Sequence, residues 1–502
     1  MIRQLTLSLT MAIALASALP TTVSAQGASD EMVLEEVIVT AIRRETGLME
    51  TPVAVSAFDQ DTLAREGVNN LVNIGSLVPN MQVGLSPSDS GVQIALRGIT
   101  SNNFTELGDP TVGIHVDGMY SPRPQGALAL LYDVERIDIM RGPQGTLFGR
   151  NSTSGTINII TSRPDTNEFG GSVEVELGNY SNVATRGWLN IPAGDKVAFR
   201  ASFMSQQMDT YLNQYMDEYD LDWDVDGDGR TDGPNDVPAD GIPNTDQRRN
   251  YKQSDSEAYG SIDRWGARLS ARFMPTDRID WILTYDHFQD NSPGVPFLKD
   301  CEKAKGTFFE CDHPLFDLRV NTPGELDMSI KTIRSEFLWD ATDWFSVEYR
   351  YAYAEQDRSQ LFDQDAGAFP DPDHPGYGID IDGELFGGVR GWMIRDEQAF
   401  YDLGFQPRAL QPFEDLALET EYSHYKSQVH DLIIKSEGDS RLQWLAGFFY
   451  LEEDNEIKFN VEIPWCCGFI RPLAQSFVQP KRTVESEAVF AQFDFAVNDL
   501  LN

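Results

Sequence analysis

An acidic segment offers the clearest candidate for metal chemistry. Residues 222–236 read DWDVDGDGRTDGPND. Calcium favours several oxygen ligands at this spacing, around a glycine that allows a sharp turn. Counted from Asp224 as the first position of the loop, position 12 is Asn235, where an EF-hand has a bidentate glutamate. We predict a structural calcium ion here, with a solvated acidic loop as the alternative. Its ligands would be the side chains or, for the arginine, the carbonyl of Asp224, Asp226, Asp228, Arg230 and Asp232.

The four cysteines are the next candidates for chemistry. Cys301 and Cys311 flank the short polar segment CEKAKGTFFEC, and we predict that they form a loop-closing disulfide. Cys466 and Cys467 are adjacent, so a bridge between them would be strained, and their connectivity stays open. The Cys-x-x-Cys spacing of a zinc site does not occur.

Catalytic motifs are missing from the sequence. None of the six histidines stands in an HExxH pattern, and the nucleophile-elbow and P-loop patterns do not occur. We therefore expect no enzymatic activity and no required cofactor. The formal net charge of −40 argues against nucleic acid as a partner, because phosphates demand a basic surface.

The N-terminus carries a targeting signal. Residues 1–25 combine Arg3, a short apolar stretch and the small residues Val23-Ser24-Ala25, which is the pattern of a secretory signal peptide. The apolar stretch is shorter than the roughly 20 residues of a membrane-spanning helix. We predict export from the cytoplasm.

Residues 165–502 repeat one theme, in which an apolar and a polar face alternate along a strand. This alternation is typical of an outer-membrane β-barrel; a soluble β-sandwich alternates too. The clearest examples are 172–177, 196–203, 345–353, 442–450 and 488–497.

The connections between these strands are of two kinds. Short turns are predicted at 193–196, 275–278, 341–344, 437–440 and 497–500. Long polar loops are predicted near 206–256, 290–326, 356–416 and 455–483. This asymmetry favours a barrel with short periplasmic turns and long extracellular loops.

Residues 51–164, which we call the plug segment, show a mixed pattern. Strands are predicted at 51–59, 92–99 and 112–120, and helical spacing at 61–77. The segment ends in the glycine-rich stretch ERIDIMRGPQGTLFGRNSTSGTINIITSRP. We therefore predict a compact α+β domain in front of the strand-rich part.

The glycine-rich stretch resembles the signature at the end of the plug domain of TonB-dependent outer-membrane receptors. The arginine-glycine after the strand at 92–99 and the VDG turn at 116–118 resemble further pieces of that domain, in the same order. The resemblance implies an α+β plug followed by an antiparallel transmembrane barrel of 22 strands. About ten strands are counted here, so we expect a chain truncated at its C-terminus.

The resemblance also implies roles for single residues. Arginines at the places of Arg97 and Arg141, each followed by a glycine (Gly98 and Gly142), pair with carboxylates of the barrel wall and lock the plug. The turns of the plug need glycine, whose backbone accepts positive φ. Besides Gly142, these turn glycines are Gly118, Gly145, Gly149 and Gly155.

The segment 26–50 would lie in the periplasm. Its apolar island EEVIVTA is rich in β-branched residues, which favour extended backbone. In the family such an island is the TonB box, which adds as a strand to the energising partner, and strand addition tolerates sequence variation. An ordinary edge strand is the alternative. The predicted box is Glu36, Val37, Ile38, Val39, Thr40 and Ala41.

The implied function is TonB-dependent uptake across the outer membrane of a Gram-negative bacterium. An iron–siderophore complex is the expected ligand; glycans, cobalamin and other organic nutrients are alternatives. The expected partners are the TonB–ExbB–ExbD complex, outer-membrane lipid with lipopolysaccharide, and the small-molecule ligand, with the receptor a monomer. A passive porin or a calcium-dependent surface adhesin is the alternative of another class.

Overall fold

The computed structural model describes most of the chain between Ile38 and residue 497. The described residues are 38–39, 43–44, 46–47, 51, 53–68, 71–85, 92–101, 108–121, 131–219, 248–296, 316–320, 322–363, 417–438, 440–463 and 473–497. The chain divides into two compact units, Met1–Ile38 and Val39–Asn502. Of the first unit only Ile38 is described, and the account below concerns the second.

The plug segment forms a five-stranded sheet in the order β3-β8-β9-β6-β7 and a separate hairpin, β4-β5. Strands β6 and β9 are parallel, and the other pairs are antiparallel. The strands are β3 (Val55–Asp59), β4 (Met81–Leu85), β5 (Val92–Leu96), β6 (Val112–Val116), β7 (Met119–Ser121), β8 (Val134–Arg141) and β9 (Gly155–Thr161). Two short elements, β1 (Ile38–Val39) and β2 (Thr46–Gly47), precede them.

Three short helices accompany this sheet. They are α2 (Gln60–Arg65), α3 (Leu71–Gly75) and α4 (Gly145–Phe148). Asp59 caps α2 by accepting a hydrogen bond from the Thr62 amide. The helix predicted over 61–77 is therefore two helices, because the chain leaves α2 through Gly67 at φ +64°, a conformation that no α-helix contains.

An apolar core holds the plug segment together. The fully buried residues of β8 and β9 contact those of α3 and the β4-β5 hairpin. The largest of them are Leu71, Ile74, Leu96, Ile114, Ile137, Ile139, Ile157 and Ile159. Alternation is lost on β6 and β9, every residue of which is buried, as is usual for strands covered on both faces.

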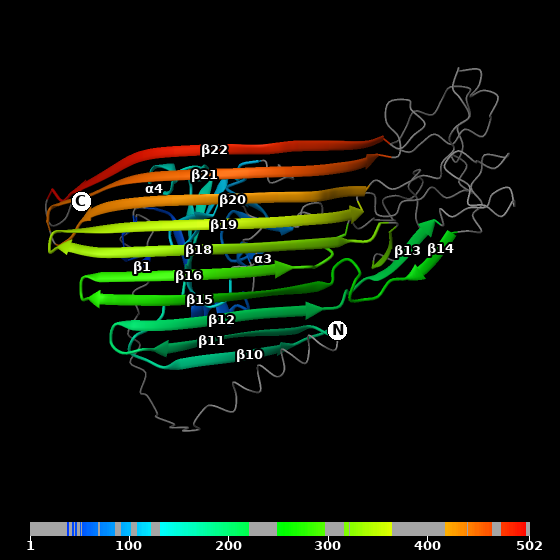
Figure 1. Cartoon of the computed structure of the whole chain (residues 1–502), viewed down its shortest axis with the longest axis horizontal. Helices are drawn as coiled ribbons and strands as arrows, with labels where there is room; N and C mark the ends of the chain where they lie inside the picture. Colours follow the sequence, from blue (N-terminus) through cyan, green and yellow to red (C-terminus); the bar gives the residue numbers. More distant parts are fainter. Residues whose placement is uncertain are drawn as a thin grey trace, which may run out of the picture. The chain divides into compact units, whose positions relative to one another are not determined.

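The second part of the chain is a ten-stranded sheet, which we call the wall. Its order is β10-β11-β12-β15-β16-β18-β19-β20-β21-β22, with every neighbouring pair antiparallel (Figure 1). The strands are β10 (Gly170–Leu177), β11 (Val183–Pro192), β12 (Val197–Met208), β15 (Ile262–Thr276), β16 (Ile279–Asp290), β18 (Glu325–Thr342), β19 (Phe345–Asp363), β20 (Ala417–Ser436), β21 (Leu442–Ile463) and β22 (Leu473–Phe495). The predicted count of about ten strands is confirmed.

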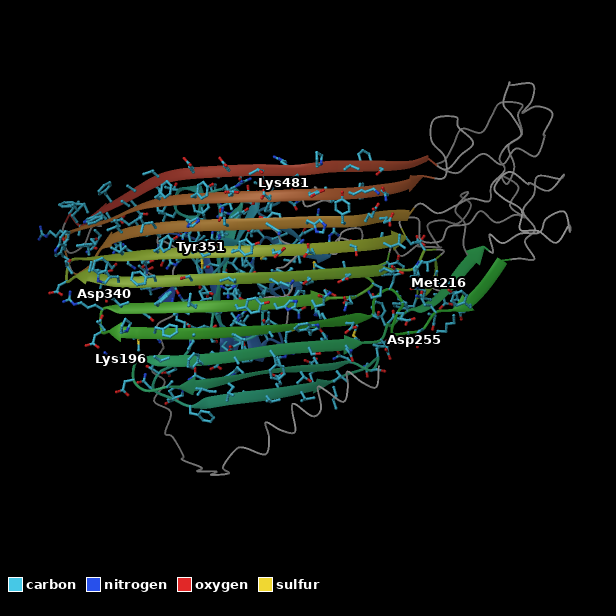
Figure 2. All side chains as sticks on the ribbon, viewed as in Figure 1. Lys196, Met216, Asp255, Asp340, Tyr351 and Lys481 are labelled. Atoms are coloured by element: carbon cyan, nitrogen blue, oxygen red, sulfur yellow. The ribbon has the colours of Figure 1, made fainter. Side chains whose placement is uncertain are left out.

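The predicted turns at 193–196, 275–278, 341–344 and 437–440 each join two neighbouring strands. Lys196 and Asp340 lie at the end of the wall that carries these turns, whereas Met216 and Asp255 lie at the opposite end (Figure 2). The predicted limits of the long loops are wrong, because β19 continues to Asp363, β21 to Ile463, and β22 begins at Leu473. At 356–360 both faces of β19 are polar, which hid that part of the strand in the sequence, whereas β21 keeps the apolar Ile457 and Phe459 on one face.

A small third sheet lies within two of the predicted loops. Its order is β14-β13-β17, and β13 pairs parallel to β17. The strands are β13 (Asn213–Tyr219), β14 (Arg248–Lys252) and β17 (Asp317–Val320). Tyr259 joins this sheet to the end of β19, because its hydroxyl accepts a hydrogen bond from the Asp363 amide at 2.7 Å.

One face of the wall is turned away from the plug segment and carries an apolar band. On β21 the band consists of the five alternate residues from Leu442 to Tyr450, which span nine positions of the strand. A strand needs about 9–11 residues to cross the hydrocarbon core of a bilayer. Tyr351 belongs to this band (Figure 2). On the same face beyond the band, the residues become charged, as in the pairs Lys426–Glu355 and Lys481–Asp454.

No helix in the described part of the chain is long and apolar enough to cross a membrane.

Candidate plug–wall interface

The other face of the wall carries charged side chains that bind the plug segment. Asp133, at the turn before β8, receives two hydrogen bonds from Arg200 of β12, at 2.5 and 2.8 Å. The Arg200 guanidinium also lies 4.0 Å from the centre of the Trp188 ring. Both ionic side chains are nearly buried, so this bidentate pair fixes position as well as charge.

A chain of alternating charges continues along the wall. Asp117, in the β6–β7 turn, lies 3.2 Å from Arg334 of β18. Arg334 contacts Asp286 of β16 at 2.9 Å, and Asp286 contacts Arg268 of β15 at 2.6 Å. Arg268 is 1% exposed and also donates a hydrogen bond to the carbonyl of Tyr132 in the plug segment. One buried aspartate, Asp286, thus holds two arginines that both reach the plug.

A third group of charges lies nearer to the short turns. Arg163, just after β9, contacts Glu336 of β18 at 2.9 Å. Arg350 of β19 bridges Glu336 and Glu348, at 3.2 and 2.8 Å. Lys435 completes the group at 2.5 Å from Glu348. The plug segment therefore meets the wall mainly through ion pairs.

The main apolar contact is made by β7, further from the short turns than the third group of charges. Met119 and Tyr120 of β7 form a cluster with Ala352, Val429, Phe449 and Leu451 of the wall. Beside it, Arg150 lies 3.6 Å from Glu453 of β21 and 2.7 Å from Asp109. This contact is the plug–wall joint that lies furthest from the short turns along β21.

Two arginines follow the predicted TonB box, and the first of them, Arg43, binds both the plug and the wall. Arg43 donates hydrogen bonds to the carbonyls of Gly118 and Leu147, at 2.9 and 3.0 Å. Its guanidinium lies 4.8 Å from the centre of the Phe148 ring and 3.1 Å from Asp431 of β20. Burial lowers the pKa of Arg43, although Asp431 opposes that effect. Arg43 therefore connects the N-terminal segment with α4, the β6–β7 turn and the wall.

Arg44 contacts the wall alone. It donates hydrogen bonds to the carbonyls of Ser436 and Trp444, at 2.8 and 2.7 Å, and to the Ser436 hydroxyl. These carbonyls lie at the ends of β20 and β21 next to the short turn between them. The two adjacent arginines therefore fix one point of the chain to the plug and to the turn end of the wall.

A cavity of about 530 Å³ separates the plug segment from this end of the wall. Its lining is mostly charged and has both signs, which suits water and polar solutes better than an apolar ligand. The charged lining residues are Arg43, Arg44, Arg136, Arg163, Arg350 and Lys435, with Asp117, Glu135, Glu336, Asp340, Glu348 and Glu437.

His115 is the one buried histidine among the described residues. It lies on β6 between the rings of Tyr120 and Phe148, and its Nε2 is 3.2 Å from the Phe148 carbonyl oxygen. Burial, assisted by the charge of Arg43, lowers the pKa of His115 to about 3. The ring is therefore neutral at physiological pH, and it serves packing in the plug core.

The arginines predicted to lock the plug occupy different surroundings. Arg97 is exposed, has φ 55°, and its guanidinium lies beside Gly142. Neither Arg97 nor Arg141 forms an ion pair with a described residue of the wall. Their locking role stays a prediction. The ion pairs that join plug and wall here come from Arg43, Asp117, Asp133, Arg150 and Arg163.

The predicted turn glycines divide into two kinds. Gly118, Gly142 and Gly149 have positive φ, as does Gly98 of the predicted lock, whereas Gly145 begins α4 and Gly155 begins β9 without it. Gly155 is required for a different reason, since a Cβ there would lie 2.2 Å from Leu96 and 2.5 Å from the Met140 carbonyl. The expectation of positive φ is therefore wrong for Gly145 and Gly155.

Several predicted sites lie outside the described residues. These are the calcium segment 222–236, the four cysteines, and Glu36, Val37, Thr40 and Ala41 of the predicted TonB box. Ile38 and Val39 are extended, as β1. Within the described ranges, no group of three or more histidine, cysteine or acidic side chains is arranged to hold a metal ion.

The anchoring residues that the sequence reasoning missed share one signal. Asp117 and Asp133 stand in left-handed turns at φ 52° and 51°, where aspartate is among the few tolerated non-glycine residues. Each lies beside a strand of the plug sheet. An aspartate in a turn next to a buried strand was therefore a visible candidate, but its partner arginine lies 67 residues away for Asp133 and 217 (334 − 117) for Asp117.

Comparison with known proteins agrees with this geometry. Residues 47–156 match the family model of the TonB-dependent receptor plug domain. The pesticin receptor of Yersinia enterocolitica is 35% identical over 106 residues, which cover 20% of this chain and 15% of that protein. The ferripyoverdine receptor of Pseudomonas aeruginosa is 31% identical over 145 residues, which cover 29% of this chain and 17% of that protein.

Solved structures extend the likeness from the plug to the wall. The ferric yersiniabactin uptake receptor FyuA from Yersinia pestis aligns with a TM-score of 0.58 and 14% identity, covering 89% of this chain and 62% of that one. The ferripyoverdine receptor of the outer membrane of Pseudomonas aeruginosa aligns with a TM-score of 0.59 and 12% identity, covering 92% and 52%. The chain thus spans about half to two thirds of these receptors.

A plug domain joined by ion pairs to a strand wall with an apolar outer band is the arrangement that these structures share with the chain. Residues 47–156 belong to the plug-domain family of TonB-dependent receptors, and the ten described strands of the wall have the fold of those receptors. The place of the chain is the outer membrane.

Proposed function

We propose that this protein takes up a scarce ligand across the outer membrane by TonB-dependent active transport, and that the ligand is an iron–siderophore complex. The observation that carries the proposal is a plug domain matched over 47–156 and attached to the wall by charged contacts. Such contacts stabilise a docked domain, and they exchange with water more readily than an apolar interface does.

Energy enters through the predicted TonB box, Glu36 to Ala41. The box lies two residues before Arg43, whose contacts reach α4, the β6–β7 turn and Asp431 of the wall. A pull on the box loads these contacts first. Their loss frees the part of the plug that borders the 530 Å³ cavity and extends that cavity along the wall.

The ligand class rests on the relatives. Their names state that they receive ferripyoverdine and ferric yersiniabactin. The strongly negative net charge does not oppose an anionic ferric chelate within the described interface, because the acids there are paired with arginines and a lysine. Cobalamin is the second candidate, since a vitamin B12 transporter of Vibrio vulnificus is 30% identical over 173 residues, covering 34% of this chain and 27% of that protein.

The remaining partners follow from the same proposal. TonB with ExbB and ExbD supplies the energy, outer-membrane lipid and lipopolysaccharide surround the apolar band, and the receptor acts as a monomer. The family consists of receptors and transporters and not of enzymes. A passive porin would need no plug, and an adhesin would need no plug signature.

The test is an uptake assay on cells that express the full-length receptor under iron starvation. Ile38→Pro removes a main-chain donor from the predicted box and blocks strand addition. We expect the uptake of labelled ferric chelate to fail while binding at the cell surface persists. Ile38→Val, which keeps both the donor and the β-branched shape, is the control. Uptake at the wild-type rate in the Ile38→Pro cells would contradict the coupling role.

The calcium site and the Cys301–Cys311 disulfide remain part of the proposal. Calcium would order the segment with Asp224, Asp226, Asp228, Arg230 and Asp232. Titration calorimetry on the purified receptor should show saturable calcium binding that Asp226→Ala with Asp228→Ala weakens. An equal, weak response to magnesium would reject the site.

A further inference from the structure

One patch of the wall concentrates polar atoms that lack a partner. Gln356, Asn455 and Gln479 are the three amide side chains in the described part of the chain with buried, unpaired polar atoms. The Ser423 hydroxyl beside them is in the same state. We call these four residues the amide patch. Gln356, Ser423 and Asn455 are 3%, 0% and 5% exposed.

The four residues are neighbours on four consecutive strands. Gln356 of β19 is in register with Tyr425 of β20, and Tyr425 with Asn455 of β21. One row further, Ser423 is in register with Ile457, and Ile457 with Gln479 of β22. All lie on the face of the wall that meets the plug, since Glu453, two residues before Asn455, contacts Arg150. The patch therefore begins directly beyond that plug–wall joint, on the side away from the short turns.

The backbone at this level is irregular in a way that supports a binding role. The pairs β19–β20, β20–β21 and β21–β22 all shift register here, at Arg358/Gln360, Thr420/Tyr422 and Asn455/Ile457. The other two shifts in the wall lie beside short turns. Bulges re-aim side chains and are over-represented next to functional sites. Pro480, which has no amide hydrogen to donate, lies within the third irregularity.

Two charged neighbours of the patch, Glu453 and Arg358, have partners within the chain, whereas Arg482 of β22, in register with Asn455, is exposed. Glu453 accepts a hydrogen bond from the Tyr425 hydroxyl at 3.1 Å and contacts Arg150. Arg358 donates to Gln360 at 2.6 Å and to Thr420 at 3.5 Å. The unpaired groups are thus uncharged amide donors, one amide oxygen and one hydroxyl. A buried polar group without a partner is destabilising, so a patch of four is expected to have a binding function.

We propose that the amide patch is a ligand subsite that recognises an uncharged, oxygen-rich face, one made of hydroxyl and carbonyl groups. The amide nitrogens donate to its oxygens, and Asn455, with both polar atoms unpaired, also accepts from its hydroxyls. This proposal rests on the proposed function and narrows its ligand class. Both an uncharged ferric hydroxamate and an uncharged sugar offer this chemistry.

The experiment measures equilibrium binding to the receptor purified from outer membranes, by quenching of tryptophan fluorescence. The probes are an uncharged ferric trihydroxamate, an uncharged linear trisaccharide and a trianionic ferric tricatecholate. We expect saturable binding of one uncharged probe, and that probe identifies the source of the oxygen atoms. Asn455→Leu and Gln356→Met should each raise its Kd about tenfold, which corresponds to one hydrogen bond.

Gln428→Met is the matched control, because Gln428 lies on the outer face of β20 and donates to Glu452. It should leave the Kd unchanged. Wild-type Kd values in both patch variants would overturn the proposal, as would binding of the trianionic probe alone. Ile38→Pro should bind the probes as the wild type does. Failure of the patch is therefore distinguishable from failure of the transport function, which the uptake assay tests separately.

Discussion

The interior of the plug is apolar, whereas its interface with the wall is mostly charged. The interior is a continuous apolar cluster in which eight large side chains of α3, β5, β6, β8 and β9 are almost fully buried. The interface is mostly arginine and carboxylate, with one small apolar cluster around Tyr120. The plug domain therefore has an apolar interior and a mostly charged surface where it contacts the wall.

This difference separates two kinds of stability. Apolar burial is non-directional and grows with area, so the plug core tolerates small shifts. Buried ion pairs depend on geometry and on each partner being present. We infer that the plug can leave the wall as an intact body, or lose one anchor, without exposing its apolar core.

The largest loss of stability is expected when the aspartate that holds two buried arginines is removed. Asp286→Ala should destabilise the plug–wall contact by about 3–5 kcal/mol, because Arg268 and Arg334 lose their shared partner. The urea concentration at which protease cleaves the plug in outer-membrane preparations should fall. An Asp286→Ala receptor as resistant as the wild type would contradict this central role.

A second substitution lies in the plug core and does not alter the interface with the wall. Gly155→Ala should destabilise the separately expressed plug segment, residues 51–164, by about 3 kcal/mol, since the new methyl group meets Leu96 and a backbone carbonyl. Gly145→Ala is the matched control, because no atom lies within 4 Å of a Cβ there. Chemical denaturation followed by circular dichroism measures both, and similar midpoints for the two variants would refute the packing account.

The pH dependence of the plug gives a smaller effect. The pKa of His115 falls from an ordinary 6.5 to about 3 on burial, so below pH 6.5 the unfolded chain binds a proton that the folded plug does not. Stability is therefore complete above pH 6.5 and declines as the pH falls. At pH 5 the loss should be about 2 kcal/mol. His115→Gln should remove this difference between pH 7 and pH 5, and an unchanged difference would mean that other groups cause it.

The smallest effect is expected at an exposed ion pair near the short turns. Arg278 and Asp343 lie 2.6 Å apart, but the side chains are 53% and 90% exposed. Asp343→Ala should shift the urea concentration at which protease cleaves the plug by an amount equivalent to less than about 1 kcal/mol. Asp343→Ala is the exposed counterpart of Asp286→Ala. A comparable loss of stability in both variants would show that burial does not determine how much an ion pair contributes.

Local patterns in the sequence predicted the wall well. The alternation at 345–353 assigned Glu348 and Arg350 to the face opposite Tyr349, and these two side chains do meet the charges near the plug. The alternation worked because a strand has a period of two and the two faces meet different solvents. It failed at 356–360, where both faces are polar and the strand is held by its pairing with the neighbouring strands instead.

The anchors of the plug were not predictable in the same way. The motif around Arg141 identified the domain, but which turn aspartate meets which wall arginine depends on strand order and register. Asp133 and Arg200 are 67 residues apart, and Asp117 and Arg334 are on different sheets. No local period encodes such pairs. The same holds for the amide patch, whose members become neighbours only through the register of four strands.

The length of the last wall strands has an immunological consequence. Of the 22 positions of β21, the apolar outer band spans only the nine from Leu442 to Tyr450, and the outward residues that follow are Glu452, Asp454 and Glu456. With the short turns on the periplasmic side, as predicted, those rows project from the membrane into the medium as regular, charged β-structure. An antibody raised against this surface would recognise a folded epitope on living cells, independent of any loop sequence.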